Sequence, residues 1–500
     1  MPKKVIEQLF DKISQTPSQK AFETALLRDD CCKFKGLVGS GLNFKLVSAF
    51  KNLDRTFLMV LDNAEQAAYH LNDLEQLLSS KEVLYFPASY REAYNPEATD
   101  NANVLLRSEV LKKLSNSRKK KIIVTYPQAL FEKVISQHTL KRKTLTVKTG
   151  DVIGLDFVNE TLFEYGFDRV NFVTQPGEFS VRGGIIDVFS FAHQHPYRIE
   201  FFDEEIESLR SFDVNNQLSI SPLDQIDLLP NTSKVTFSEK RKSLIDSLPK
   251  ESTVVFNQLD LCLDRIEKLG AKAAKQFESL ETTVQYPPEV LFLNPKELLE
   301  CLAGQSTVLI NNSDHLKPQE RIGAKQSPQP SINKQFDRLV QILKDNHASG
   351  FENYIFCSSE AQRKRFNEIL EEMETKVHYK TEVCPLFEGF EDIEAQVACF
   401  TDHQIFERYH KYKLRSAAAK KEVLTLKELT HLKIGDFVTH IDHGIGKFGG
   451  LQKIDVDGVK QEAIKLSYGQ GDILYLSIHS LHKIAKFNGK DGHVPKLHKL

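Results

Sequence analysis

The chain has 500 residues, which at roughly 150 residues per domain predicts three or four domains. Its charged fraction of 27% and hydrophobic fraction of 41% are typical of a soluble globular protein, and its net charge of −2 argues against a protein coated with nucleic acid. No apolar run reaches the ~18 residues that span a bilayer and no signal core follows the N-terminus, so we expect a cytoplasmic protein without membrane contact.

Strand and helix patterns alternate along residues 1–143. Strands are predicted at 34–38, 56–61, 83–86 and 122–125, and helices at 43–51, 63–78 and 101–114. Such alternation predicts right-handed βαβ units on a mainly parallel sheet. Residues 144–222 have shorter β-branched runs and Gly-rich turns, which predict an inserted β-rich domain. The α/β pattern then resumes over 223–325 and ends in a linker rich in Ser, Pro and Gln at 326–330.

The last third of the sequence predicts two more domains. Residues 331–402 read as a small second α/β domain, whose first helix is capped by Ser331. Residues 403–431 are expected to form a basic helical linker, since 406–429 hold seven Lys and Arg and no Gly or Pro. Residues 432–487 contain only strand and turn signals and predict a small β-barrel. The expected fold class is therefore multidomain α/β with a β-rich insertion and a terminal barrel.

The string GLVGSGLN at 36–43 lies between a predicted strand and a predicted helix, as a phosphate-binding loop does. Gly36, Gly39 and Gly41 would let backbone amides wrap a phosphate. However, Leu42 replaces the lysine that reaches the phosphates, and Asn43 replaces the hydroxyl residue that holds magnesium. Losing both groups removes most of the transition-state stabilisation, so we predict a vestigial loop that hydrolyses no nucleotide.

The inserted domain contains PGEFSVRGGIIDVF at 176–189, which predicts two strands around a tight Gly-Gly turn. Arg182 precedes the turn and Arg169 lies in the preceding strand region. A guanidinium on a rigid sheet suits the capture of a partner carboxylate. An ordinary hairpin with solvent-facing arginines is the alternative, because exposed arginines are common.

Residues 432–487 predict a bent sheet with an exposed edge. Glycines interrupt the strand pattern at 444–446, and Asp457-Gly458 is a favoured hairpin turn that follows a strand at 452–456. An exposed edge at 452–456 could accept a strand from a partner. His440, His443, His479 and His482 form two HxxH pairs, but a strand and a turn without nearby Cys favour no zinc site, so no metal is predicted.

Two further features of the sequence are a run of basic residues and the set of cysteines. Six Lys and Arg fall within residues 112–121, where a solvated helix end is the usual explanation and contact with DNA phosphates the alternative. The seven cysteines show no CxxC spacing and are expected to be buried thiols in a reducing compartment.

The motifs resemble those of a known family. The loop at 36–43, YFPASYREAYNPE at 85–97 and the inserted β-domain follow the order found in the excision-repair helicase UvrB, but the aromatic hairpin that clamps damaged DNA there has no counterpart after residue 97. HIDHGIGKF at 440–448 resembles the CarD-type RNA polymerase interaction domain, and TDHQIFERYH at 401–410 also resembles a signature of that group. Together they resemble the N-terminal half of the bacterial transcription-repair coupling factors.

The resemblance implies two partners and a role in transcription-coupled nucleotide excision repair. It implies that the inserted domain docks UvrA through Arg169, Arg182 and Phe189. It likewise implies that the terminal domain adds a strand to the RNA polymerase β subunit at Lys453, Ile454 and Asp455. No cofactor is expected in these residues. In the family, ATP, magnesium and double-stranded DNA are bound by motor domains that follow these residues. The chain contains no helicase box of such a motor. We also expect a monomer.

Two other functions remain open at the level of the sequence. A UvrB-type ATP-dependent DNA repair helicase would share the first α/β domain and would show DNA-stimulated ATP turnover. A stand-alone CarD-like transcription regulator would account for residues 432–487 only.

Overall fold

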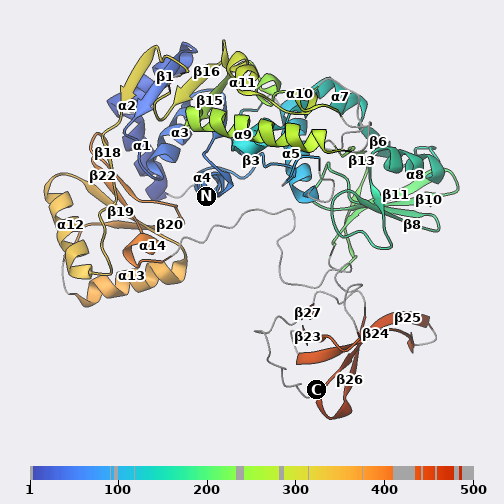
Figure 1. Cartoon of the computed structure of the whole chain (residues 1–500). Coiled ribbons are helices and arrows are strands. Elements are labelled where there is room, and N and C mark those ends of the chain that lie inside the picture. Colours follow the sequence, from blue (N-terminus) through green and yellow to red (C-terminus); the bar gives the residue numbers. More distant parts are fainter. Residues whose placement is uncertain are drawn as a thin grey trace. The chain divides into compact units, whose positions relative to one another are not determined.

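The computed structural model describes residues 4–90, 92–94, 99–116, 119–214, 216–231, 241–280, 286–313, 315–373, 376–408, 434–440, 443–456, 459–477 and 484–486. The chain divides into two compact units, Met1–Gln137 with Val235–Leu414 and His138–Lys234 with Arg415–Leu500. The sheets of each unit are coloured along the sequence in Figure 1. The predicted basic linker lies almost wholly outside the described residues, apart from its first six positions.

A seven-stranded parallel sheet forms the centre of the first α/β domain. Its order is β17-β1-β16-β15-β2-β4-β3, and every neighbouring pair is parallel. All residues of β2 and β15 are buried, as expected of strands covered on both faces by helices. The strands are β1 (Cys31–Lys35), β2 (Thr56–Val60), β3 (Val83–Tyr85), β4 (Ile122–Thr125), β15 (Ser252–Phe256), β16 (Ser306–Leu309) and β17 (Glu320–Gly323). A short pair, β5 (Val134–Ile135) with β14 (Arg241–Lys242), lies beside them in the same unit.

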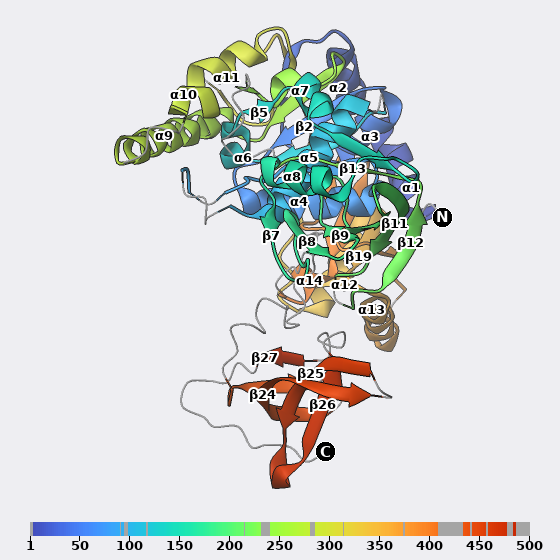
Figure 2. The same ribbon diagram turned by 90° about the vertical axis from the view of Figure 1, so that its right-hand side faces the viewer.

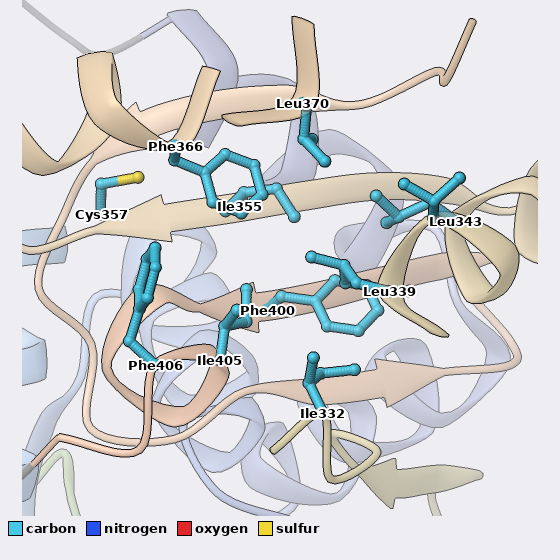
Figure 3. Packing of buried hydrophobic residues seen from close by; sticks show 12 residues of the cluster. Ile332, Leu339, Leu343, Ile355, Cys357, Phe366, Leu370, Phe400, Ile405 and Phe406 are labelled. Carbon is cyan, nitrogen blue, oxygen red and sulfur yellow. The ribbon is translucent and has the colours of Figure 1, made fainter. Parts of the chain in front are cut away.

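A second, mixed sheet of order β18-β21-β22-β19-β20 completes the first unit. Its strands are β18 (Gln326–Pro328), β19 (Glu352–Cys357), β20 (Lys380–Val383), β21 (Phe390–Asp392) and β22 (Val397–Thr401). One face carries an apolar core in which Leu343 of α12, Phe366 of α13 and Ile355 of β19 meet (Figure 3). Because side chains alternate along a strand, Phe356 points to the other face, where it lies 6.2 Å from the ring of Phe44 in the first domain. The second sheet is thus covered on both faces.

The inserted domain is built on a six-stranded sheet of order β12-β11-β10-β9-β8-β7. Its strands are β7 (Asp168–Arg169), β8 (Glu178–Arg182), β9 (Ile185–Val188), β10 (Tyr197–Phe202), β11 (Glu205–Phe212) and β12 (Ser219–Leu223). All neighbouring pairs are antiparallel except β7 with β8. A two-stranded ladder of β6 (Leu145–Lys148) and β13 (Gln225–Leu228) joins the beginning of the insertion to its end.

The terminal domain is an antiparallel sheet of order β26-β25-β24-β23-β27, drawn in red in Figure 2. Its strands are β23 (Phe437–His440), β24 (Gly444–Val456), β25 (Val459–Ser467), β26 (Ile473–Ser477) and β27 (Ile484–Lys486). The long strand β24 shifts register between Phe448 and Leu451, where Gly450 has φ +90°, and such a bulge bends a strand. In the part of the chain that the structure describes, β26 and β27 do not pair, so a small sheet is shown and a closed barrel is not.

The helices predicted at 43–51, 63–78 and 101–114 agree with the observed helices to within two residues, whereas two other predictions are wrong. Residues 326–328 of the predicted linker form strand β18, and the helix expected from Ser331 begins only at Phe336. None of the described helices is long and apolar enough to cross a membrane. The helices are α1 (Lys4–Ser14), α2 (Pro17–Leu27), α3 (Gly41–Asn52), α4 (Ala64–Leu77), α5 (Asn101–Asn116), α6 (Pro127–Phe131), α7 (Gln137–Arg142), α8 (Leu155–Glu164), α9 (Leu259–Glu278), α10 (Pro288–Leu291), α11 (Pro295–Leu302), α12 (Phe336–Ala348), α13 (Glu360–Glu372) and α14 (Asp402–Ile405).

Candidate functional site

The loop at 36–43 runs from the end of β1 into the first turn of α3, as the sequence predicts. Gly36 and Gly39 have φ of +74° and +51°, conformations that favour glycine. Leu42, in the position of the phosphate-binding lysine, is buried at 7% exposure. Asn43, in the position of the magnesium-binding hydroxyl, is fully buried and donates its Nδ2 to Asp73 Oδ2 at 2.9 Å. Neither side chain is available to a nucleotide in this arrangement.

Asp73, on α4, is the hub of the polar contacts behind this loop. Its Oδ2 also accepts from Ser40 Oγ at 2.5 Å, and its Oδ1 accepts from the backbone amide of Phe387 at 2.8 Å. Burial raises the pKa of Asp73 to about 7, although these hydrogen bonds oppose the shift. Burial likewise lowers the pKa of His70 to about 4, and its Nδ1 lies 2.9 Å from Asn43 Oδ1. Since the Asn43 amide donates to a carboxylate, its oxygen faces His70, which therefore donates from Nδ1.

Sequence reasoning missed Asp73 and the segment at residues 385–389 that contacts it. A usable signal for Asp73 was present, because Asn72 and Asp73 follow Tyr69 by three and four residues, the spacing of neighbours on one face of α4. A buried aspartate at such spacing next to Leu74 indicates a polar contact inside a packed region. Nothing local pointed to residues 385–389, which lie more than 300 residues away along the chain.

The inserted domain places the two predicted arginines in different settings. Arg169 is exposed on the edge strand β7 and forms no ion pair with any residue that the structure describes. Arg182 is 40% exposed but is already bound to the carboxylate of Asp187. Asp187 is 1% exposed and also accepts from Arg198, through Nε at 2.6 Å and Nη2 at 2.8 Å. Arg169 is therefore free to bind a carboxylate of a partner, whereas Arg182 would have to bind such a carboxylate while it also binds Asp187.

Phe189, the third residue expected on this surface, is 2% exposed. Such a side chain can support a surface from below but offers almost no area to a partner. Other apolar side chains of the domain are exposed instead, among them Phe202 at the end of β10 and Phe163 on α8. Phe163 also packs edge-on against Phe179 at 5.1 Å between ring centroids. The sequence could not distinguish these positions, because exposed and buried phenylalanines both occur within short apolar runs of this domain.

In the terminal domain, Lys453, Ile454 and Asp455 lie in the second half of β24. Their backbones pair with Glu462, Gln461 and Lys460 of β25. The pairing of β24 with β23 covers only its first residues, Gly444–Lys447. Among the described strands, the other edge of β24 at 453–456 is therefore unpaired, and β24 and β25 extend beyond the sheet as a two-stranded ribbon. The side chains of 453–456 lie outside what the structure describes.

The basic run at 112–121 has a structural role at three of its positions. Lys113 pairs with Glu109 at 2.5 Å, and Lys121 donates to the carbonyl of Lys81 at 2.9 Å. Lys120 donates its Nζ to the carbonyls of Phe50 at 2.5 Å and Leu53 at 2.8 Å, at the end of α3. Three of the six basic residues are therefore engaged by groups of the same chain. Arg118 lies outside the described residues.

The metal and thiol chemistry of the described residues is limited. They contain no group of three or more His, Cys, Asp or Glu that could hold a metal ion, and His479 and His482 fall outside them. The ring of His440 lies 4.8 Å from that of His443. All seven cysteines are free thiols, and burial raises the pKa of Cys32, Cys262 and Cys357 to about 12, which makes these thiols poor nucleophiles.

Comparison with known proteins gives two domain matches and a set of relatives. Residues 145–233 match the UvrB interaction domain, and residues 432–488 match the CarD-like/TRCF RID domain. A transcription-repair-coupling factor of Bacillus subtilis is 23% identical over 93% of this chain and 46% of its own length. Those of Haemophilus influenzae and Staphylococcus haemolyticus are 24% and 23% identical over 94% and 89% of this chain. The chain spans about half the length of the curated relatives it matches, and the resemblance stated from the sequence is confirmed.

Proposed function

We propose that this chain, a member of the transcription-repair coupling factor family, links stalled RNA polymerase to UvrA in transcription-coupled nucleotide excision repair. The observation that carries the proposal is the presence, in one chain that aligns with these factors over 93% of its length, of a UvrB interaction domain and a CarD-like/TRCF RID domain. ATP-driven movement along double-stranded DNA, with its magnesium, is proposed for the longer protein. Residues 1–500 act in the cytoplasm as a monomeric adaptor.

The polymerase contact is assigned to the free edge of β24. An unpaired strand edge offers amides and carbonyls to an extended partner segment, which adds as a further strand. Lys453, Ile454 and Asp455 lie on that edge, and the β subunit of RNA polymerase is the proposed partner. We retain a small CarD-like barrel as the complete form of this domain. The bulge at Gly449 and Gly450 supports this proposal, because the strands of a small barrel must bend and a bulge bends a strand.

Ile454→Arg tests this contact. An arginine in the middle of the added ladder should place a charge against the incoming strand and lower capture of a purified polymerase β fragment by about tenfold or more. Ile473→Arg, on the exposed face of the end strand β26, is the matched control and should leave capture unchanged. If Ile473→Arg alone abolishes capture, the opposite edge of the sheet is the docking edge.

The UvrA contact is assigned to the surface around Arg169, together with Arg182 at the end of the neighbouring strand β8 and the buried Phe189. Arg169→Glu should weaken UvrA binding and leave polymerase binding intact, since it reverses an exposed charge that has no ion pair among the described residues. Lys148→Glu makes the same charge change on the exposed strand β6 and should have no effect. Arg182→Ala is preferred to Arg182→Glu, because a glutamate would face the buried Asp187. Unchanged UvrA capture by Arg169→Glu rejects this assignment.

A UvrB-type ATP-dependent repair helicase is not favoured. That function needs a nucleotide in the loop at 36–43, where Leu42 and Asn43 are buried and lack the required chemistry. DNA-stimulated ATP turnover that is abolished by a change at Gly41 would reverse this preference. A stand-alone CarD-like regulator leaves the UvrB interaction domain without a role.

A further inference from the structure

The backbone amides of the loop at 36–43 already have acceptors. In a working phosphate loop these amides point at the phosphates. Here the amide of Val38 donates to Gln326 Oε1 at 3.1 Å, and the amide of Ser40 donates to the carbonyl of Glu388 at 3.2 Å. Both acceptors belong to strands and turns of the second α/β domain. Two groups that would hold a phosphate are therefore engaged by protein oxygens.

The space in front of the loop glycines is filled by the same two segments. A Cβ added to Gly39 would lie 2.8 Å from Glu388 Cβ and 3.1 Å from the carbonyl oxygen of Gly389. A Cβ added to Gly41 would collide with the side-chain amide of Gln326. Glycines at 39 and 41 permit close approach of another domain, which accounts for these glycines without any nucleotide.

Helix α4 holds the other side of the segment at 385–389. The ring of Tyr69 stacks on Phe387 with centroids 4.0 Å apart and planes 14° apart. Asn72 Nδ2 donates to the carbonyl of Pro385 at 2.8 Å, and Asp73 accepts from the amide of Phe387. The amide of Glu388 donates to Ser40 Oγ at 3.1 Å. The segment is thus bound through backbone groups on both of its sides.

The first turns of α3 continue the contact beyond the loop. Phe44 packs against Phe390 at 5.5 Å and Phe356 at 6.2 Å between ring centroids. Lys45 Nζ lies 3.4 Å from Asp392 Oδ2, with both side chains only 1% exposed. Helix α3, which follows the loop, is therefore buried against the second sheet at its first turns.

We propose that the loop at 36–43 binds residues 385–389 of the same chain in place of a nucleotide, and that this contact fixes the second α/β domain to the first. The loop is then a protein-binding element that keeps the phosphate-loop shape, and residues 385–389 are its resident ligand. The second α/β domain thereby fills the position that a nucleotide takes in a working phosphate loop, and the two α/β domains become one rigid body.

A double-mutant cycle in the full chain tests the contact. Gly39→Ala should lower Tm more than Gly304→Ala, which has the same kind of backbone strain at φ +86° but no atom within 4 Å of the added Cβ. Adding Glu388→Gly removes the Cβ that the new methyl group at position 39 would strike, so it should restore part of the loss. Backbone strain at residue 39 cancels in the cycle, and the remaining non-additivity measures the contact between domains. Additive changes in Tm would overturn the proposal.

Hydrogen exchange keeps the proposal testable if Gly39→Ala does not fold. The amides of Phe387 and Glu388 donate to Asp73 and Ser40, so a peptide covering 385–390 should exchange slowly in the full chain. Asp73→Asn should speed its exchange on the order of tenfold or more, whereas Glu352→Gln, which alters an exposed ion pair between the same domains, should not. Unchanged exchange in Asp73→Asn would contradict the proposed ligand.

A fluorescent ATP analogue with magnesium provides the nucleotide arm of the test. The unmodified chain should show no saturable binding of this probe, because the amides and the space of the loop are occupied. Saturable binding that Gly39→Ala abolishes would show that the loop still accepts a nucleotide and would overturn the assignment of residues 385–389 as its ligand.

Discussion

Lys45 carries an ammonium group into the boundary between the two α/β domains, and each of its three protons has a partner there. Nζ lies 2.8 Å from Thr16 Oγ1, 3.1 Å from Ser18 Oγ and 3.4 Å from Asp392 Oδ2. Burial lowers the pKa of Lys45, while Asp392 and Glu394 oppose that shift. A charge so placed is stabilised only as long as the complete set of partners stays assembled.

Lys45→Met should therefore destabilise the chain by about 3–5 kcal/mol, because it leaves the Asp392 carboxylate buried without its counter-ion. Urea unfolding measures the loss. Lys12→Met is the matched control, since Lys12 pairs with Glu352 across the same two domains but their side chains are 34% and 38% exposed. That exposed pair should be worth about 0–1 kcal/mol. Equal losses in the two variants would show that burial does not set the strength of these contacts.

The buried Asp73 should give the chain an uncommon pH dependence. Its folded pKa of about 7 lies above the ordinary value of 3.8, so the folded state binds more protons between those limits and the stability from this group is lost as pH rises from 4 to 7. His70 has the opposite sign, because its pKa is lowered from 6.5 to about 4 and its contribution is lost as pH falls through that window.

Comparison of Asp73→Asn with the unmodified chain isolates the first of these effects. The Tm difference in favour of the unmodified chain should shrink steadily from about pH 4.5 to about pH 7.5, since the variant has no carboxyl to ionise. His70→Gln is the control, because the Tm difference between the unmodified chain and this variant should grow, not shrink, as pH rises. A difference that stays constant across this range would mean that Asp73 titrates at its ordinary value.

At the scale of elements, Lys120 of the basic run binds the carbonyl groups at the C-terminus of α3. A cation at a helix C-terminus satisfies carbonyls that lack intrahelical donors. Lys120→Ala should therefore cost roughly 1–2 kcal/mol, because its Nζ bonds the carbonyls of Phe50 and Leu53. Lys119→Ala, next to it and exposed, should cost less than about 0.5 kcal/mol. Thermal melts of both variants decide the matter, and equal effects would restore the solvated-run interpretation.

The elements that the sequence predicts correctly are those whose signal is local. Buried runs such as Ile122–Thr125 and capped helices such as Ala64–Leu77 are where the pattern places them. Strand β18 escaped prediction because Gln326–Pro328 is an end strand of its sheet, where proline is tolerated and apolar alternation is not required. The helix after Ser331 starts late because Asn333 and Lys334 have φ of +53° and +60°, which no helix accommodates.

The candidate sites divide in the same way. The defect at Leu42 and Asn43 could be read from eight consecutive residues, because the template is local. The ion pair between Arg182 and Asp187 could have been predicted from the register of the hairpin, since these residues lie only five apart in the sequence. The filling of the loop by Glu388 depends on a contact between residues 348 positions apart, for which a single sequence contains no signal.

At the scale of the molecule, the second sheet explains why two domains should behave as one. The face of β19 that bears Ile355 packs under α12 and α13, whereas the opposite face bears Phe356 and meets Phe44 of the first domain. A sheet covered on one side by another domain loses that cover when the other domain unfolds. A destabilising substitution in the core of either α/β domain should therefore destabilise both of them. The stability of the inserted domain, which belongs to the other unit, should not change.

Leu343→Ala tests this coupling from the far face of the second sheet. Removing a fully buried leucine should cost about 2–5 kcal/mol, and the cost should appear as faster amide exchange at Thr56–Val60 in the first domain as well as around residue 343. Leu209→Ala makes an equivalent cavity in the six-stranded sheet, where Leu209 is 2% exposed, and should leave exchange at Thr56–Val60 unaltered. If Leu343→Ala speeds exchange only within residues 326–408, the two α/β domains unfold separately, and the loop contact is too weak to make them one cooperative body.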